Sequence, residues 1–134
     1  MQIFVTDKDP NLAVKWLDDR RLNKMIVETV QILSHSFNGP YKLTHKHHPC
    51  VKWSLESQEN RNWLVQYLVA LYNERVLRTG KGHLSYAKFV DFTGIEGATY
   101  NIDKIKFCNC TPYKGLEVIE AYRHLIKVKQ TAEV

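Results

Sequence analysis

The sequence of 134 residues lacks several features that would define a function class at once. It has no apolar run of 18 or more residues, so we expect no membrane-spanning helix. Its first ten residues, MQIFVTDKDP, lack the basic start and long apolar region of a secretory signal. A glycine-rich phosphate loop, a nucleophile-elbow serine, zinc-finger spacing and internal repeats are also missing. The three cysteines, two of them in Cys108-Asn109-Cys110, predict free thiols in a reducing cytoplasm.

The overall composition is that of a globular protein, with 44% hydrophobic and 25% charged residues. The length favours one domain over residues 1–134. Apolar residues recur at helical spacing through most of the chain, which predicts an all-α fold. We expect a single compact helical domain. Its two long helices should span residues 17–37 and 50–78, the second with a kink around Ser57. A long irregular segment should cover residues 92–115, and a C-terminal helix should follow from residue 115 onward.

One short stretch, LDDRRLNKMIVETVQILSH, carries the most chemically capable side chains. Its apolar residues cover one broad arc of a helix, and a polar row follows on the shoulder of that arc. The row spans roughly 80° of the helix and consists of Arg21, Lys24, Glu28, Gln31 and His35. Such a row fits the wall of a cleft, but it is also typical of surface pairing worth about 0.2–0.5 kcal/mol per pair. The residues alone leave both interpretations open.

The following stretch, GPYKLTHKHHPCVKW, is rich in histidine and lysine. His45, His47 and His48 could donate to phosphate or move protons near neutral pH, and Trp53 could stack on a base. The same histidines with Cys50 could bind a metal ion, although their spacing fits no standard zinc pattern. We therefore expect a substrate-facing loop without a metal ion or other cofactor, and a plain surface loop is the alternative.

The segments LDDRRLNKMIVETVQIL and HHPCVKW resemble the pyrimidine-dimer DNA glycosylase/AP-lyase (phage endonuclease V-like) family and its phage and bacterial relatives. The ending TPYKGLEVIEAYRHLI is similar to phage proteins of the same kind. The resemblance implies a compact all-helical fold and excision of damaged bases from DNA. It also implies that Glu28 assists Schiff-base chemistry at the sugar carbon C1′, with the N-terminal amine as nucleophile, while Arg21 and Lys24 grip phosphate.

The sequence departs from the family at the nucleophile. Family enzymes expose the amine of a small residue after losing the initiator methionine, whereas residue 2 here is Gln, a large side chain that normally leaves Met1 in place. The amine of Met1 could attack a sugar carbon only if it reached Glu28.

Three functions from different classes fit these observations. The first is a DNA-processing enzyme with Glu28, Met1 and His48 as catalytic residues and with a substrate-binding set of Arg21, Lys24, Gln31, His35, His45, His47 and Trp53. The net charge of +5 suits a phosphate-bearing partner such as DNA or a nucleotide. The second is a non-catalytic nucleic-acid- or nucleotide-binding module, and the third is a zinc-stabilised structural protein. We favour the enzyme.

Overall fold

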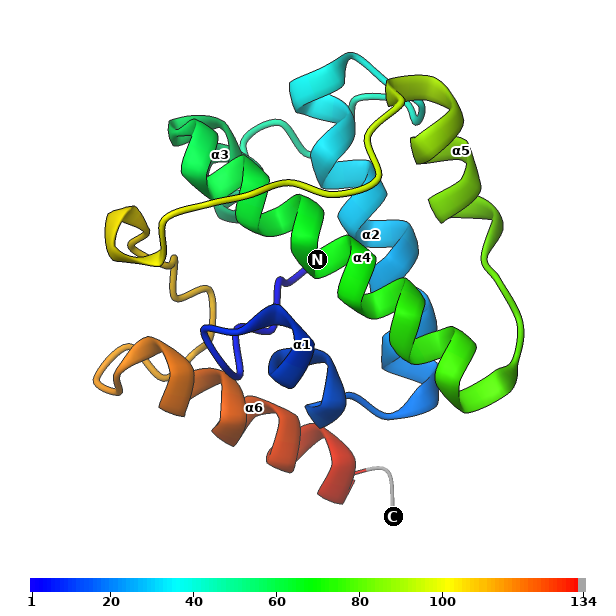
Figure 1. Ribbon diagram of the computed structural model, residues 1–134. Helices are drawn as coiled ribbons and strands as arrows, with labels where there is room; N and C mark the ends of the chain where they lie inside the picture. Colours follow the sequence, from blue (N-terminus) through cyan, green and yellow to red (C-terminus); the bar gives the residue numbers. More distant parts are fainter. Residues whose placement is uncertain (133–134) are drawn as a thin grey trace.

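The computed structural model describes residues 1–132, and in that range the chain forms six α-helices and two 3₁₀ turns with no strand (Figure 1). The prediction of an all-α fold is therefore confirmed. The two long helices, α2 (Asp19–Phe37) and α4 (Gln58–Thr79), pack against each other through the middle of the molecule. The shorter elements around them are α1 (Pro10–Ala13), η1 (Val14–Trp16), α3 (Pro49–Glu56), α5 (Leu84–Thr93), η2 (Ile102–Lys104) and α6 (Val118–Ala132).

Helix α2 begins and ends where local chemistry requires it. The Asp18 carboxylate accepts a hydrogen bond from the Arg21 N–H at 2.8 Å, which satisfies one of the free donors of the first turn. At the other end Asn38 adopts the left-handed conformation with φ 58°, and the Gly39 N–H closes the last turn on the Ser34 carbonyl. The predicted apolar arc is the buried face of the helix, with Leu22, Met25, Ile26, Thr29, Val30, Ile32 and Leu33 in the core. The polar row consequently lies beside the core face.

The predicted kink at Ser57 is a complete break between α3 and α4. Ser57 is extended (φ −155°, ψ 157°), and its hydroxyl accepts a hydrogen bond from the Asn60 N–H at 3.0 Å. The side chain of Asn60 is buried, and its amide nitrogen donates a hydrogen bond to the Trp53 carbonyl at 2.8 Å, so this buried polar group has a partner. A capping serine in extended conformation therefore divides what the periodicity presents as one helix.

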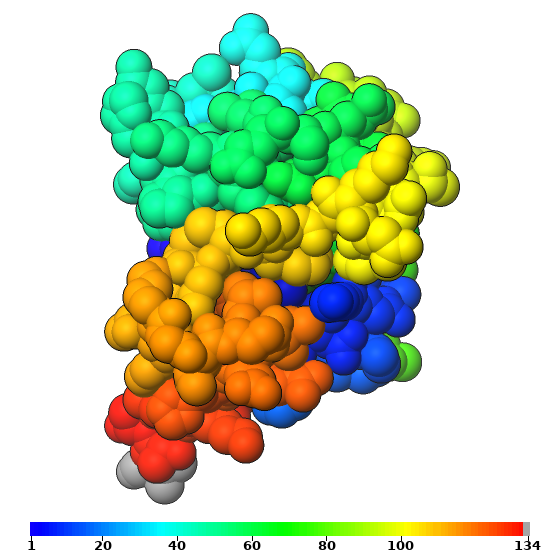
Figure 2. All heavy atoms as spheres, turned by 90° about the vertical axis from the view of Figure 1, so that its left-hand side faces the viewer, coloured from blue at the N-terminus to red at the C-terminus, as the bar shows by residue number. Residues whose placement is uncertain are grey.

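Aromatic rings from α3, α4 and the irregular segment form the centre of the core. The Trp63 ring stacks on Tyr67 at 5.3 Å between centroids and meets the edge of Phe107 at 4.9 Å. Phe107 anchors the long connection from α5 to α6, which was expected to be irregular and contains only the short turn η2. In Figure 2 the gold and orange part of this connection lies between the green helices and the red end of α6.

The N-terminal segment, residues 1–6, is held between α2 and α6 without forming a strand. Ile3 and Val5 are buried, and the Thr6 carbonyl accepts a hydrogen bond from Arg123 Nε at 2.7 Å. This path brings Met1 to the surface of α2. Helix α6 begins at Val118, three residues later than expected. Within residues 1–132 no helix combines the length and apolarity needed to cross a bilayer.

Candidate active site

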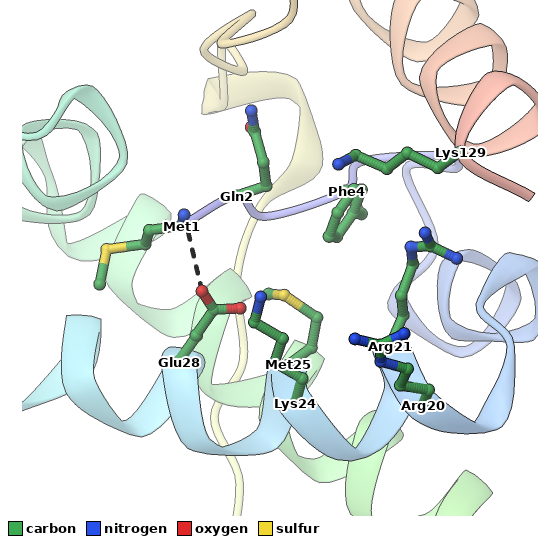
Figure 3. A pocket seen from close by; sticks show the side chains of 9 residues that line it. All are labelled: Met1, Gln2, Phe4, Arg20, Arg21, Lys24, Met25, Glu28 and Lys129. Atoms are coloured by element: carbon green, nitrogen blue, oxygen red, sulfur yellow. Dashed lines mark ion pairs between the residues drawn. The ribbon is translucent and has the colours of Figure 1, made fainter. Parts of the chain in front are cut away.

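A cavity of about 240 Å³ opens where the N-terminal segment meets α2 and α6. This volume is slightly below the range of about 300–1,000 Å³ typical of sites for drug-sized ligands, so it suits one sugar or base. The N-terminal segment, the first half of α2 and one side chain of α6 form its walls (Figure 3). The lining residues are Met1, Gln2, Phe4, Arg20, Arg21, Lys24, Met25, Glu28 and Lys129.

An amine and a carboxylate face each other at one end of this cavity. The nitrogen of the Met1 amine lies 3.5 Å from Glu28 Oε1, and the two side chains are 7% and 16% exposed. Figure 3 shows Glu28 rising from α2 toward the end of the N-terminal segment. An N-terminal amine and a carboxylate therefore lie in contact at a site that is mostly shielded from water but open to the cavity.

Positively charged side chains surround the rest of the cavity. Arg20, Arg21 and Lys24 come from the first turns of α2, and Lys129 reaches across from α6 (Figure 3). The guanidinium of Arg21 forms an ion pair with Asp18. Burial alone would raise the pKa of Asp18, but hydrogen bonds from the Arg21 backbone and side chain outweigh it and lower the pKa. Within residues 1–132, four cationic side chains and one carboxylate line the cavity, which makes the site suited to phosphate groups.

The hydroxyl of Tyr67 is also electrostatically coupled to Glu28. Tyr67 is fully buried in α4, and its hydroxyl has no hydrogen-bond partner among the described residues. Burial raises the pKa of Tyr67 strongly, and the charge of Glu28 raises it further. The phenol thus stays protonated and can only act as a neutral dipole toward the carboxylate.

Of the three histidines of the loop, His48 is the one coupled to the amine and carboxylate. Its Nδ1 accepts a hydrogen bond from the Cys50 N–H at 3.0 Å and caps α3. Burial lowers the pKa of His48 and the charge of Cys110 opposes that effect, while smaller contributions come from the N-terminal charge, which lowers the pKa, and from Glu28, which raises it. His48 is therefore a neutral imidazole near the candidate site at pH 7, although it does not line the cavity.

The other predicted residues do not converge on the cavity. His45 and His47 are exposed, and Gln31 is absent from the lining. His35 Nε2 contacts the Thr44 carbonyl at 2.6 Å and lines a different hollow near the end of α2. The histidine-rich stretch is thus mainly a surface loop.

Trp53 requires a correction. It was expected to offer a face to a base, but its side chain is only 2% exposed. Its indole N–H donates to the Lys106 carbonyl at 2.8 Å, and its ring stacks on Phe107 at 5.8 Å between centroids. Both ring faces belong to the core because Trp53 lies on the inner side of α3, so it cannot stack on DNA.

Three free thiols form a cluster next to the N-terminal segment. Cys110 Sγ is 3.6 Å from Cys50 Sγ and 3.2 Å from Cys108 Sγ. The hydrogen bond from Cys50, with a second from Cys108, lowers the pKa of Cys110 to about 5 in spite of burial. Across residues 1–132 no group of three or more His, Cys, Asp or Glu side chains is arranged to hold a metal ion.

Sequence reasoning missed four lining residues that matter for the chemistry. Arg20 was available from the LDDRRL motif but lies outside the polar row, about 100° around the helix from Arg21. Gln2, Phe4 and Lys129 join the site only through contacts between distant segments. No local pattern in the sequence signals such contacts.

The fold and this site define a compact helical protein whose N-terminal amine meets a carboxylate in a cation-lined cavity. Residues 1–87 match the model of the pyrimidine dimer DNA glycosylase family, and the chain belongs to that family. The resemblance inferred from the helix motif is therefore confirmed, and membership places the chain among DNA-repair glycosylases. No curated protein and no solved structure matches the chain. The matched range includes Met1 and α2 but ends before α6.

Proposed function

We propose that the protein is a DNA glycosylase and AP lyase that acts at C1′ of a damaged nucleotide, with the Met1 amine as nucleophile and Glu28 as acid and base. The observation that carries the proposal is the 3.5 Å contact between the Met1 nitrogen and Glu28 Oε1 inside the cavity. Direct contact between nucleophile and base is the arrangement that covalent catalysis requires. The family match supports DNA as the substrate.

The proposed reaction begins when Glu28 takes a proton from the Met1 ammonium. The neutral amine attacks C1′, the bond from C1′ to the base breaks, and the base leaves with the electron pair and receives the proton held by Glu28. Glu28 then carries a second proton from the attached nitrogen to the ring oxygen O4′, so the sugar ring opens and a protonated Schiff base remains. In the lyase step Glu28 removes a C2′ proton, and the 3′ phosphate leaves.

The cations around the cavity hold the DNA backbone in this proposal. Arg20, Lys24 and Lys129 meet phosphates on either side of the damaged nucleotide, while Asp18 orients Arg21 toward the same backbone. His48, a neutral imidazole at pH 7, assists Glu28 by taking up or releasing protons between steps. The phosphate contacts bring C1′ to the amine, which is the positioning effect that supplies much of the rate in bound reactions.

The experiment is reductive trapping on two duplexes, one with an abasic site and one with a cyclobutane pyrimidine dimer. Sodium borohydride reduces a Schiff base to a stable amine, so a protein–DNA adduct is expected with the unchanged chain and should map to residue 1. Glu28→Gln, which keeps the size but removes the base, should lower trapping by at least about 100-fold, the lower end expected for a general base. Glu120→Gln, an exposed carboxylate on α6, is the matched control.

Each of the alternative outcomes of this experiment would contradict part of the proposal. DNA binding without an adduct would favour the non-catalytic binding module. An adduct that maps to a lysine would reject Met1 as nucleophile, and so would a native chain whose intact mass shows a different first residue. An adduct on the abasic duplex alone would restrict the activity to the lyase step.

A further inference from the structure

The side chain of Gln2 is fixed at both of its polar ends. Gln2 Nε2 donates to the Cys110 carbonyl at 3.1 Å, and Gln2 Oε1 accepts from the Tyr122 hydroxyl at 3.1 Å. The same hydroxyl accepts from the Cys110 N–H at 3.3 Å and is 3.3 Å from the Cys108 carbonyl. Gln2, Tyr122 and the turn at 108–110 therefore form one hydrogen-bonded group, which we call the Gln2 anchor.

The next residues of the N-terminal segment are held by the same helix. The Phe4 ring meets the edge of the Tyr122 ring at 6.3 Å between centroids, and Tyr122 is fully buried. Arg123 donates to the Thr6 carbonyl. Chain termini are usually poorly ordered unless something ties them down. Here the ties extend to the residue next to the amine.

These ties come from a part of the chain that the family match does not include. The match ends at residue 87, whereas the partners of the N-terminal segment are Cys110, Tyr122 and Arg123. Residue 2 has a second effect, because a side chain as long as Gln normally leaves the initiator methionine in place. The same side chain thus favours retention of Met1 and also ties the residue next to its amine to Tyr122.

We propose that Gln2 and Tyr122 are positioning residues, which hold the Met1 amine against Glu28 through the Gln2 anchor. The inference rests on the proposed function, since it concerns the amine that attacks C1′. Neither residue touches the reacting atoms. Without the anchor, the terminal residue could rotate away from Glu28, and displacements near 1 Å can cost about 100-fold in rate.

Two variants test the anchor from its two sides. Tyr122→Phe removes only the hydroxyl, and Gln2→Met removes the amide while keeping a long side chain that retains Met1. Tyr113→Phe removes a hydroxyl from the same C-terminal region, outside the anchor, and is the matched control. Thermal melting and intact mass first establish that each variant is folded and begins at Met1.

The readout is the single-turnover trapping rate as a function of DNA concentration. For Tyr122→Phe and Gln2→Met we expect the saturating rate to fall about 10- to 100-fold, while the half-saturating DNA concentration changes less than about two-fold, because the cations are untouched. A second readout without DNA is the labelling rate of the Met1 amine by a small acylating reagent, which should rise in both variants. A merely structural role would not change the saturating rate selectively.

The inference is overturned if both variants trap DNA at the rate of the unchanged chain, or if only the half-saturating concentration changes. Failure of the proposed function would look different, because then the unchanged chain itself would form no adduct.

Discussion

The carboxylate of Glu74 joins the end of α4 to the start of the helix that carries the site. Its side chain is 9% exposed, and its oxygens accept from Lys15 Nζ at 2.8 Å and from Arg78 Nε at 3.3 Å. Arg78 in turn donates to the Leu17 carbonyl at 2.7 Å and to Asp19 at 3.1 Å. We predict that Glu74→Gln destabilises the protein measurably, because it removes the charge that these two cations share.

The free energy of unfolding that Glu74→Gln should remove depends on how exposed Lys15 and Arg78 are. A hydrogen bond to a charged group contributes about 1.5–3 kcal/mol to stability. Lys15 is 54% exposed, so its ion pair with Glu74 should contribute only about 0.2–1 kcal/mol, as surface pairs do. The amide of Gln keeps one acceptor for Arg78, so the loss should be about 2 kcal/mol, less than the 3–5 kcal/mol of a fully broken buried pair. For a chain of this size that lowers Tm by roughly 6–10 °C.

The pH dependence gives a sharper test than the magnitude alone. Burial would raise the pKa of Glu74, but the hydrogen bonds from Lys15 and Arg78 outweigh it and lower the pKa. A lowered carboxyl pKa stabilises the folded state fully above the unfolded value of about 4.3 and loses that effect as pH falls through the folded value.

Urea unfolding of the unchanged chain and Glu74→Gln should therefore differ most at pH 7, and the difference should shrink below about pH 4. Lys15→Gln is the control for the exposed partner and should cost less than 1 kcal/mol by the range for surface pairs, about 0.2–1 kcal/mol. A free energy of unfolding that is equal in the two proteins at pH 7, or a difference that stays constant down to pH 3, would refute the reasoning.

Two further predictions concern the cavity and the thiol cluster. Because the pKa of Cys110 is lowered to about 5, its thiolate should already be formed at pH 6, so alkylation by iodoacetamide should change little between pH 6 and 8, as followed by peptide mass mapping. A rate that rises steeply over that interval would contradict the assignment. Lys129→Ala should weaken DNA binding and reduce the slope of log K against log salt by about 1. Lys127→Ala, an exposed lysine on the same helix and outside the cavity lining, should leave that slope unchanged.

The parts of the fold that sequence reasoning predicted are those governed by short-range spacing. The bounds of α2 and the buried arc on it follow from helical periodicity and from capping residues within four positions of each end. Around Ser57 the sequence predicted only a kink, and the structure shows a complete break there because the serine caps α4 from an extended backbone. Trp53 was misjudged because it follows a polar loop, and only the packing of α3 shows that its ring faces inward.

Residue spacing predicted the candidate site only on the side that α2 supplies, whereas Met1 was named through the family resemblance. Arg21, Lys24 and Glu28 share a helix face, so their proximity follows from spacing alone. The amine of Met1 and the anchor of Gln2 depend on pairs 108 and 120 residues apart, for which the sequence contains no periodic signal. Gln at position 2 looked like an obstacle to the family chemistry, since it retains the methionine. In the structure the same side chain accepts a hydrogen bond from Tyr122, and under the proposed function this departure from the family places the Met1 amine beside Glu28.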